Sequence, residues 1–204
     1  MHNQNQNHNH SELSKKAREG MVQSAFMLAG FTVFWAAFIF WGFGMNAPSV
    51  ILFTAFTGLA IVIFRSAAKA RRAVRLLPVA PPDPEDKRAG TRWTVIFSVQ
   101  GGVIGAVCAV LGILGQYQYI VPAVALIVGI HYFPLGAIYR TKIHFAVGVF
   151  VVLCAVFGIM SQAFGILGFR AIGVCAIATA LSTVILGIYI MRGCLLPVSQ
   201  TSIG

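Results

Sequence analysis

The side chains of this chain that could do chemistry are few, and they lie within long apolar segments. His131 and Gln100 lead the set, and three hydroxyl residues, Thr57, Ser182 and Thr183, complete it. Polar atoms in an apolar medium cost free energy unless they are hydrogen-bonded or hydrated. These residues are therefore the candidates for a ligand-binding layer.

The positions of the candidates relative to flanking basic residues indicate one common depth. His131 precedes Arg140 by nine residues, and Gln100 follows Arg92 by eight. At the helical rise of about 1.5 Å per residue, both lie ~12–14 Å from the same side of the membrane. The hydroxyl residues stand at similar separations from the nearest arginine. The sequence predicts a polar layer slightly to the basic side of the bilayer midplane.

Pro134 follows His131 by three residues and lacks a backbone N–H, so the carbonyl of Ile130 loses its helical donor. A kink is predicted there. Two interpretations of His131 follow. It could be a proton carrier, a ligand contact or a metal ligand beside a broken helix. It could instead be a neutral imidazole that is hydrogen-bonded to Gln100 or to a freed carbonyl and holds helices together.

Carboxylates are absent from the apolar segments. All five acidic residues lie outside them, and they are Glu12, Glu19, Asp83, Glu85 and Asp86. This distribution argues against a buried Asp or Glu proton relay and against a carboxylate metal site. No Ser-His-carboxylate or Cys-His arrangement can be assembled, and no glycine-rich nucleotide loop occurs. The sequence therefore predicts a protein that is not an enzyme and that holds no metal or cofactor.

His144 is a weaker candidate than His131. It follows Lys142 by two residues and should therefore reach the membrane interface. Its depth should differ from that of His131 by about 10 Å at the helical rise, which disfavours a haem held between the two histidines.

Six long apolar segments must position these residues. Each approaches the ~20 residues that a helix needs to cross the ~30 Å hydrocarbon core of a bilayer. The segments are 21–43, 48–64, 93–114, 117–139, 143–160 and 169–191. Since 58% of all residues are hydrophobic and 10% are charged, a water-soluble fold is not expected. The predicted fold is all-α: a polytopic integral membrane protein, in which six transmembrane helices form a bundle with a Pro-kinked fourth helix.

Basic residues gather on one side of the predicted membrane. Of fifteen Lys and Arg, Arg170 alone falls on the other side, and the positive-inside rule then places both termini in the cytoplasm. The predicted parts are a disordered basic tail over 1–20, a transmembrane domain over 21–192 with a cytoplasmic loop over 65–92, and a C-terminal tail over 193–204. This topology explains the net charge of +10, so nucleic acid is not an expected partner.

The basic stretch after the second segment is the candidate site for anionic lipid headgroups. Residues 65–77 are rich in Ala, Arg and Leu and should continue the second helix to an end near Pro78. Residues 78–92 contain four prolines and are predicted to be an extended linker. The stretch is either an arm that binds headgroups or a partner, or a topology determinant that lies at the headgroups. The headgroup candidates are Arg65, Lys69, Arg71, Arg72 and Arg75.

Small residues recur at four-residue spacing on two segments and predict helix–helix contacts, because helices in lipid associate through close backbone approach. One set is Gly101, Gly105 and Ala109, and the other is Cys175, Thr179, Thr183 and Gly187. The neighbour could belong to the same chain or to a second copy in a homo-oligomer. The similarity of 107–114 to 153–160 is either a parallel repeat of two hairpins or a chance agreement of apolar residues.

The stretch GIHYFPLGAIYRTK, residues 129–142, together with KKAREG before the first segment, resembles a family of small, uncharacterised six-span bacterial membrane proteins. The signature of that family is G-x-H-x-x-P-[LF], followed by a short basic turn and another span. Gly129, His131, Pro134 and Leu135 stand at the motif positions. The resemblance implies six spans over nearly the whole chain, in a bacterial inner membrane, and it implies no activity. The Pro-rich inner loop and the Asn/Gln/His-rich tail depart from the compact family pattern.

The sequence thus predicts a non-catalytic membrane protein that binds a small molecule, a lipid or a partner helix through the His131 region. The alternative is a small-solute transporter or channel. Transport requires a polar path that opens to both sides of the membrane, whereas the outer halves of the segments are nearly all apolar. This pattern favours the binding or structural module.

Overall fold

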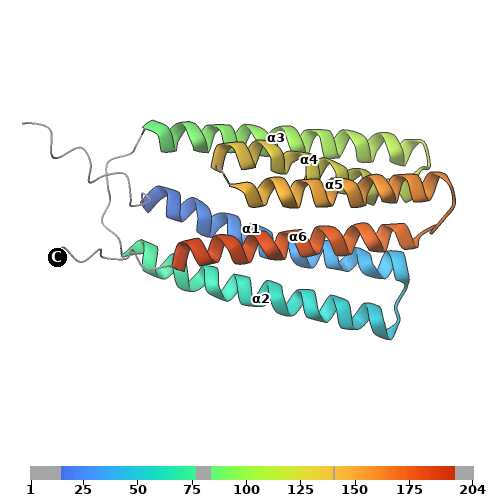
Figure 1. The fold of residues 1–204 in the computed structure, drawn as a ribbon, viewed down its shortest axis with the longest axis horizontal. Helices are drawn as coiled ribbons and strands as arrows, with labels where there is room; N and C mark the ends of the chain where they lie inside the picture. Colours follow the sequence, from blue (N-terminus) through green and yellow to red (C-terminus); the bar gives the residue numbers. More distant parts are fainter. Residues whose placement is uncertain (1–14, 77–83, 140, 196–204) are drawn as a thin grey trace, which may run out of the picture.

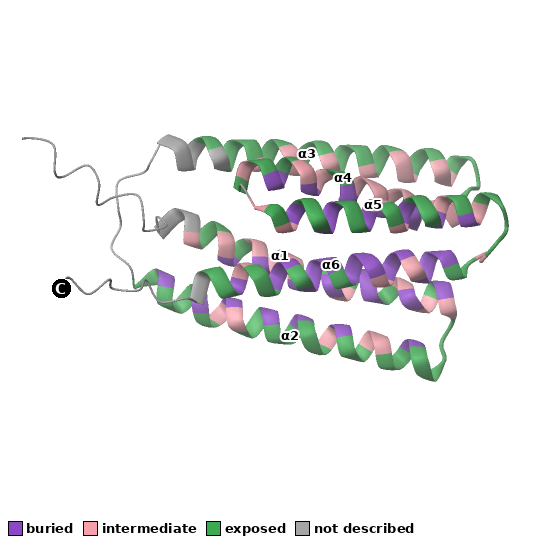
Figure 2. Ribbon diagram, viewed as in Figure 1, coloured by how far each residue is buried: buried purple, intermediate pink, exposed green. Residues whose placement is uncertain are grey.

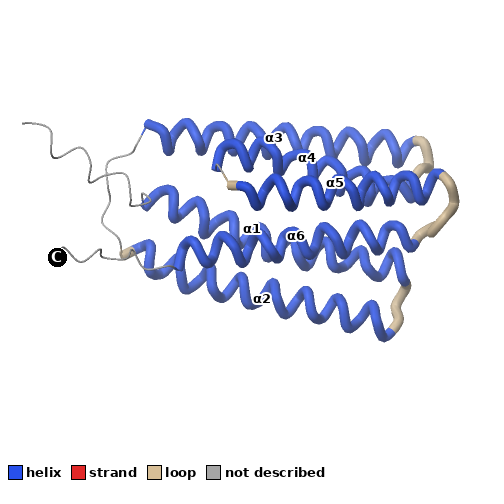
Figure 3. Tube along the Cα trace, viewed as in Figure 1, coloured by secondary structure: helices blue, strands red, loops and turns tan. Residues whose placement is uncertain are grey.

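The helices of the chain follow the predicted spans. A computed structural model describes residues 15–76, 84–139 and 141–195. The described residues form six long α-helices and one 3-10 turn, with no strand among them (Figures 1 and 3). Each long helix contains a stretch that is long and apolar enough to cross a membrane, so the chain is an all-α, multi-pass membrane protein. Residues 1–14 and 196–204 of the predicted tails and most prolines of the inner loop lie outside the described residues, whereas residues 15–20 and 193–195 belong to helices.

The helices alternate in direction, so that their ends gather at two opposite ends of the bundle (Figure 1). They are α1 (Lys15–Phe43), α2 (Ala47–Arg75), α3 (Pro84–Ile113), α4 (Ile120–Tyr139), α5 (Lys142–Ala163) and α6 (Arg170–Leu195), and the 3-10 turn η1 (Tyr117–Tyr119) precedes α4. The start of α1 and the end of α2 share one end with the start of α5 and the end of α6. We call it the basic end, because Arg71, Lys142 and Arg192 belong to these helix termini.

The basic stretch after the second span is helical, as predicted. Asn46 caps the start of α2 by accepting a hydrogen bond from the backbone N–H of Ser49 at 2.9 Å. The helix then continues to Arg75, with Leu76 as its C-cap, and so ends before Pro78. Ala and Arg are strong helix formers, and they allow α2 to extend beyond the length that hydrocarbon requires.

The prediction of an extended linker over 78–92 is wrong for its second half, because α3 already begins at Pro84. Proline breaks a helix only where it lies in the helix interior, so the prolines of this stretch do not all exclude a helix. In the first turn of a helix no backbone N–H is required, and proline is favoured there.

The helices form two groups of three, with α1, α2 and α6 in one and α3, α4 and α5 in the other (Figure 1). α6 is the central helix: it packs against α1, α2, α4 and α5, and 72% of its apolar stretch is buried. α3 lies at the edge and packs chiefly against α4. None of its apolar stretch is buried, a contrast with α6 that Figure 2 shows. The hairpins α3–α4 and α5–α6 thus occupy unlike environments, which favours chance as the origin of their sequence similarity.

Glycines set the closest helix crossings. A Cβ added to Gly42 of α1 would lie 2.2 Å from the backbone nitrogen of Gly173 of α6. A Cβ added to Gly129 of α4 would lie 2.9 Å from the backbone nitrogen of Val152, and one added to Gly148 of α5 would lie 3.0 Å from the carbonyl oxygen of Gly129. Only a residue without a side chain allows two backbones to approach so closely. α4 runs through Pro134 without interruption, and the kink there stays a prediction.

The small-residue sets behave differently in the two helices. The members of the α6 set with buried side chains are Cys175, Thr179 and Thr183. Gly187 completes the set, because a Cβ there would meet the side chain of Ile63 on α2. On α3 the set has no contact within the described chain at its glycines: Gly101 and Gly105 are exposed, and a Cβ at either would have nothing within 4 Å. Of the two neighbours considered for this set, the second copy stays a prediction. α3 instead turns Phe97 and its neighbours toward the core.

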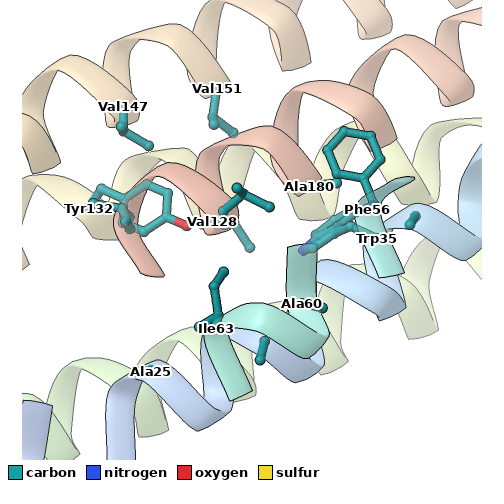
Figure 4. Packing of buried hydrophobic residues seen from close by; sticks show 14 of the residues in the cluster. Ala25, Trp35, Phe56, Ala60, Ile63, Val128, Tyr132, Val147, Val151 and Ala180 are labelled. Atoms are coloured by element: carbon teal, nitrogen blue, oxygen red, sulfur yellow. The ribbon is translucent and has the colours of Figure 1, made fainter. Parts of the chain in front are cut away.

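The hydrophobic core joins α1, α2, α4, α5 and α6. Figure 4 shows buried residues of these helices, among them Trp35 of α1, Phe56 of α2, Val128 of α4, Val151 of α5 and Ala180 of α6. No described side chain of α3 is fully buried. The polar residues considered next are therefore positioned mainly by α4, α5 and α6.

Candidate functional site

The predicted polar layer divides into separate contacts. Thr183 of α6 meets Thr32 of α1, with 2.9 Å between their hydroxyl oxygens, and both residues are buried. Each hydroxyl also lies 2.8 Å from a carbonyl oxygen of its own helix, that of Leu28 for Thr32 and that of Ala180 for Thr183. Thr183 is therefore part of a polar link between α1 and α6. Sequence reasoning missed Thr32, because nothing in the sequence distinguishes an intramembrane threonine that forms such a link from one that only packs.

Ser182 belongs to a second link, between α6 and α4. Its hydroxyl donates to the carbonyl oxygen of Thr179 at 2.7 Å, and its side chain lies near the phenol of Tyr132 on α4. Figure 4 shows the ring of Tyr132 beside α6. Sequence reasoning missed Tyr132, although a tyrosine in mid-span carries a polar group that requires a partner.

His131 is held by its own helix and by aromatic neighbours. Its Nδ1 lies 2.6 Å from the carbonyl oxygen of Val128, so that Nδ1 carries a proton and donates it there, because a carbonyl oxygen can only accept. The ring centroid lies 5.4 Å from that of Phe97 on α3, at an edge-to-face angle of 71°, and 4.5 Å from that of Tyr132. The second interpretation of His131 expected its hydrogen-bond partner to be Gln100 or the freed carbonyl of Ile130. The acceptor is instead the carbonyl oxygen of Val128. The ring nevertheless bridges α3 and α4.

Gln100 and Thr57 do not join the other candidates. Among the described residues, the buried oxygens Gln100 Oε1 and Thr57 Oγ1 have no hydrogen-bond partner. Gln100 lies on α3 and Thr57 on α2, two helices that belong to different groups of the bundle. The sequence placed these residues at one depth but could not show that their helices stand apart. Pro134 lies on α4 with its side chain exposed.

His144 lies at the start of α5, as predicted from its distance to Lys142, but its ring is buried, with 6% of the residue exposed. Its Nδ1 is hydrogen-bonded to the hydroxyl of Thr141. Its ring stacks on Tyr139 with centroids 5.8 Å apart and lies 6.5 Å from Tyr132. The close approach of α4 to α5 encloses this ring in the packing at the helix ends, and its position at the membrane interface stays a prediction.

Ring contacts thus connect three helices toward the basic end. We call the six residues the aromatic–imidazole cluster: Trp93 and Phe97 of α3, His131, Tyr132 and Tyr139 of α4, and His144 of α5. Within the part of the chain that the structure describes, no three His, Cys, Asp or Glu side chains group as metal ligands.

A cavity of about 570 Å³ lies elsewhere, between α1 and α2 at the basic end. Its lining residues are Glu19, Val22, Gln23 and Phe26 of α1 with Arg71, Val74 and Arg75 of α2. Two of the predicted headgroup candidates, Arg71 and Arg75, thus line a concave surface. All five candidates are exposed on α2, and the other three, Arg65, Lys69 and Arg72, do not contribute to this lining.

Sequence reasoning missed the α1 wall of this cavity. Glu19, Val22, Gln23 and Phe26 stand at the spacing of one helix face, a pattern that could have indicated a common surface but not the partner helix.

Comparisons of the chain with protein-family models, with curated proteins and with solved structures find no match.

Proposed function

We propose that this membrane protein is a non-catalytic binding or structural module, in which the polar residues around His131 tie helices together. The observation that supports it best is the environment of His131. Its Nδ1 is engaged by the Val128 carbonyl, and its ring contacts Phe97 and Tyr132. A ring so engaged anchors the peripheral helix α3 to α4.

The contacts of the other candidates support the same role. The pairs Thr32–Thr183 and Tyr132–Ser182 each cross an interface of α6. Hydrogen bonds between membrane helices stabilise association by about 0.6 kcal/mol on average. Several such links, placed on the central helix, give the bundle one defined arrangement.

We propose further that the basic end faces the cytoplasm of a bacterial inner membrane. The positive-inside rule supports this orientation, because the basic residues of α2, α5 and the last turn of α6 share that end. Lipid covers the exposed apolar surface, and a second copy of the chain is the alternative partner for the glycine-bearing face of α3. The resemblance to the six-span bacterial family stays a prediction.

Reconstitution separates this proposal from the alternative of a small-solute transporter or channel. The purified full chain and its His131→Ala variant are placed in liposomes and assayed for uptake of a broad solute panel. We expect both to match protein-free liposomes, and we expect the variant to melt at a lower temperature because it loses the ring contacts.

The opposite result is equally clear. Uptake by the wild type that is lost in a folded His131→Ala variant would replace the module by a transporter with His131 on its path. Uptake that is unaffected by the variant would retain transport and remove His131 from the mechanism.

A further inference from the structure

The cavity between α1 and α2 is lined by both polar and apolar side chains. The polar groups come from Glu19 and Gln23 on α1 and from Arg71 and Arg75 on α2. The residues of each helix are spaced by three or four positions, so that each set occupies one helix face. The volume of about 570 Å³ falls in the range of small-molecule sites.

The charge of the polar side chains suits one negative charge. Two guanidinium groups and one carboxylate give 2 − 1 = +1 for the lining residues. Guanidinium groups bind phosphate oxygens through paired, charge-assisted hydrogen bonds. A phosphodiester carries a single negative charge and so balances the site, and a hydroxyl group beside it would find acceptors in Glu19 and Gln23.

The apolar side chains suit a hydrocarbon chain. Val22 and Val74 are buried, with 3% and 5% of each residue exposed. The ring of Phe26 packs edge-on against that of Phe64 on α2, with centroids 4.9 Å apart. Phe64 is itself 53% exposed, so this aromatic pair connects the cavity to the apolar outer surface of α2. A free inorganic ion would leave these side chains without a complement.

The depth of the cavity is that of lipid headgroups. α2 has 29 residues and is therefore about 43 Å long, well beyond the ~30 Å of hydrocarbon. Phe64 is about 27 Å from the start of α2 by the helical rise, and Arg71 is about 10 Å further. The Phe26–Phe64 pair thus marks the hydrocarbon boundary, and the arginines lie at the phosphates, toward which their side chains can extend.

We propose that this cavity is a binding site for one anionic glycerophospholipid. Arg71 and Arg75 hold its phosphodiester, Glu19 and Gln23 accept hydrogen bonds from a hydroxylated headgroup, and an acyl chain leaves along Phe26 and Phe64. The proposal concerns a site distant from His131 and does not depend on the role of that residue.

Lipid titration of the full chain, followed by native mass spectrometry, tests the site. The probes are phosphatidylglycerol and phosphatidylcholine, and the variant is the double substitution Arg71→Gln/Arg75→Gln. We expect the wild type to prefer phosphatidylglycerol. We expect the variant to bind it about 25-fold more weakly, since each basic group near anionic lipid contributes about fivefold in affinity.

The matched control is Arg65→Gln/Arg72→Gln, which removes the same charge from exposed positions of the same helix outside the cavity. It should weaken binding clearly less than the cavity variant does, because Arg65 and Arg72 do not line the cavity. A second variant, Gln23→Trp, fills the cavity without a change of charge and should also lose the preference for phosphatidylglycerol. Melting temperatures confirm that each variant is folded.

Three results would overturn the proposal. Equal losses in the two arginine variants would indicate diffuse attraction to α2, and unchanged binding by Gln23→Trp would remove the cavity as the site. Competition by an excess of soluble glycerol phosphate would reassign the site to a free phosphate compound. Failure of any of these tests would leave the proposed role of His131 unaffected.

Discussion

The hydroxyl groups of Thr32 on α1 and Thr183 on α6 lie 2.9 Å apart in a buried interface. Each is also within 2.8 Å of a carbonyl oxygen of its own helix. Two hydroxyl protons therefore serve three contacts, since a hydroxyl donates one hydrogen bond. One threonine donates across the interface while the other donates to its own helix.

We expect Thr183→Val to lower the free energy of unfolding by about 1 kcal/mol, because the link between α1 and α6 is lost while the shape of the side chain is kept. Denaturation in mixed detergent micelles measures the change. A double-mutant cycle with Thr32→Val should show coupling, and Thr54→Val at an exposed position of α2 is the control. Strict additivity of the two changes would mean that the pair contributes nothing.

Gly42 and Gly105 should respond oppositely to alanine. A Cβ at Gly42 meets the backbone of Gly173 at 2.2 Å, whereas one at Gly105 meets nothing within 4 Å. We expect Gly42→Ala to cost about 1–3 kcal/mol through overpacking and Gly105→Ala to stay within about 0.5 kcal/mol of the wild type. Thermal unfolding compares them. A large loss in Gly105→Ala would indicate that another molecule, such as a second copy, packs on this face of α3.

Removal of the phenol of Tyr132 should break the link to Ser182. We expect Tyr132→Phe and Ser182→Ala each to lower the free energy of unfolding by about 1 kcal/mol, and the double variant to lose little more than either. The measurement is a double-mutant cycle in detergent. Full additivity would show that the two side chains are not partners.

The ring contacts of His131 should matter more than its hydrogen bond to Val128. Because it contacts Phe97 and Tyr132, we expect His131→Phe to retain most of the stability of the wild type. His131→Ala should be less stable than His131→Phe by about 1 kcal/mol. Comparison of the two melting curves decides this point. If the phenylalanine variant were as unstable as the alanine variant, the hydrogen bond to Val128 would be the dominant contribution.

The proposed orientation predicts the accessibility of cysteine probes. In a chain whose own cysteines are replaced by alanine, we expect Asn46→Cys to react with an impermeant maleimide in intact cells. Arg72→Cys should react only after the cells are permeabilised. The reverse pattern would place the basic end outside and would reverse the proposed topology.

The sequence by itself determined the six spans and the extension of α2. In lipid every backbone polar group must be satisfied internally, so a run of about 20 apolar residues has essentially one conformation available. The Ala- and Arg-rich stretch over 65–75 continued the helix because its residues favour that state locally. Local chemistry also explains why α3 begins at Pro84, since proline is favoured in the first turn of a helix.

The tertiary structure alone decided which of these helices meet. Thr32 and Thr183 are separated by 151 positions, and nothing in their local sequences selects one as the partner of the other. Nor could the sequence show that Gly105 is exposed and Thr179 is buried, since both belong to sets of small residues at the same spacing. In lipid the apolar faces of helices are nearly equivalent in hydrophobicity, so neighbours are selected by the fit of whole surfaces. That fit left α3 at the edge, placed α6 at the centre, and brought Glu19 and Arg71 to the two sides of one cavity.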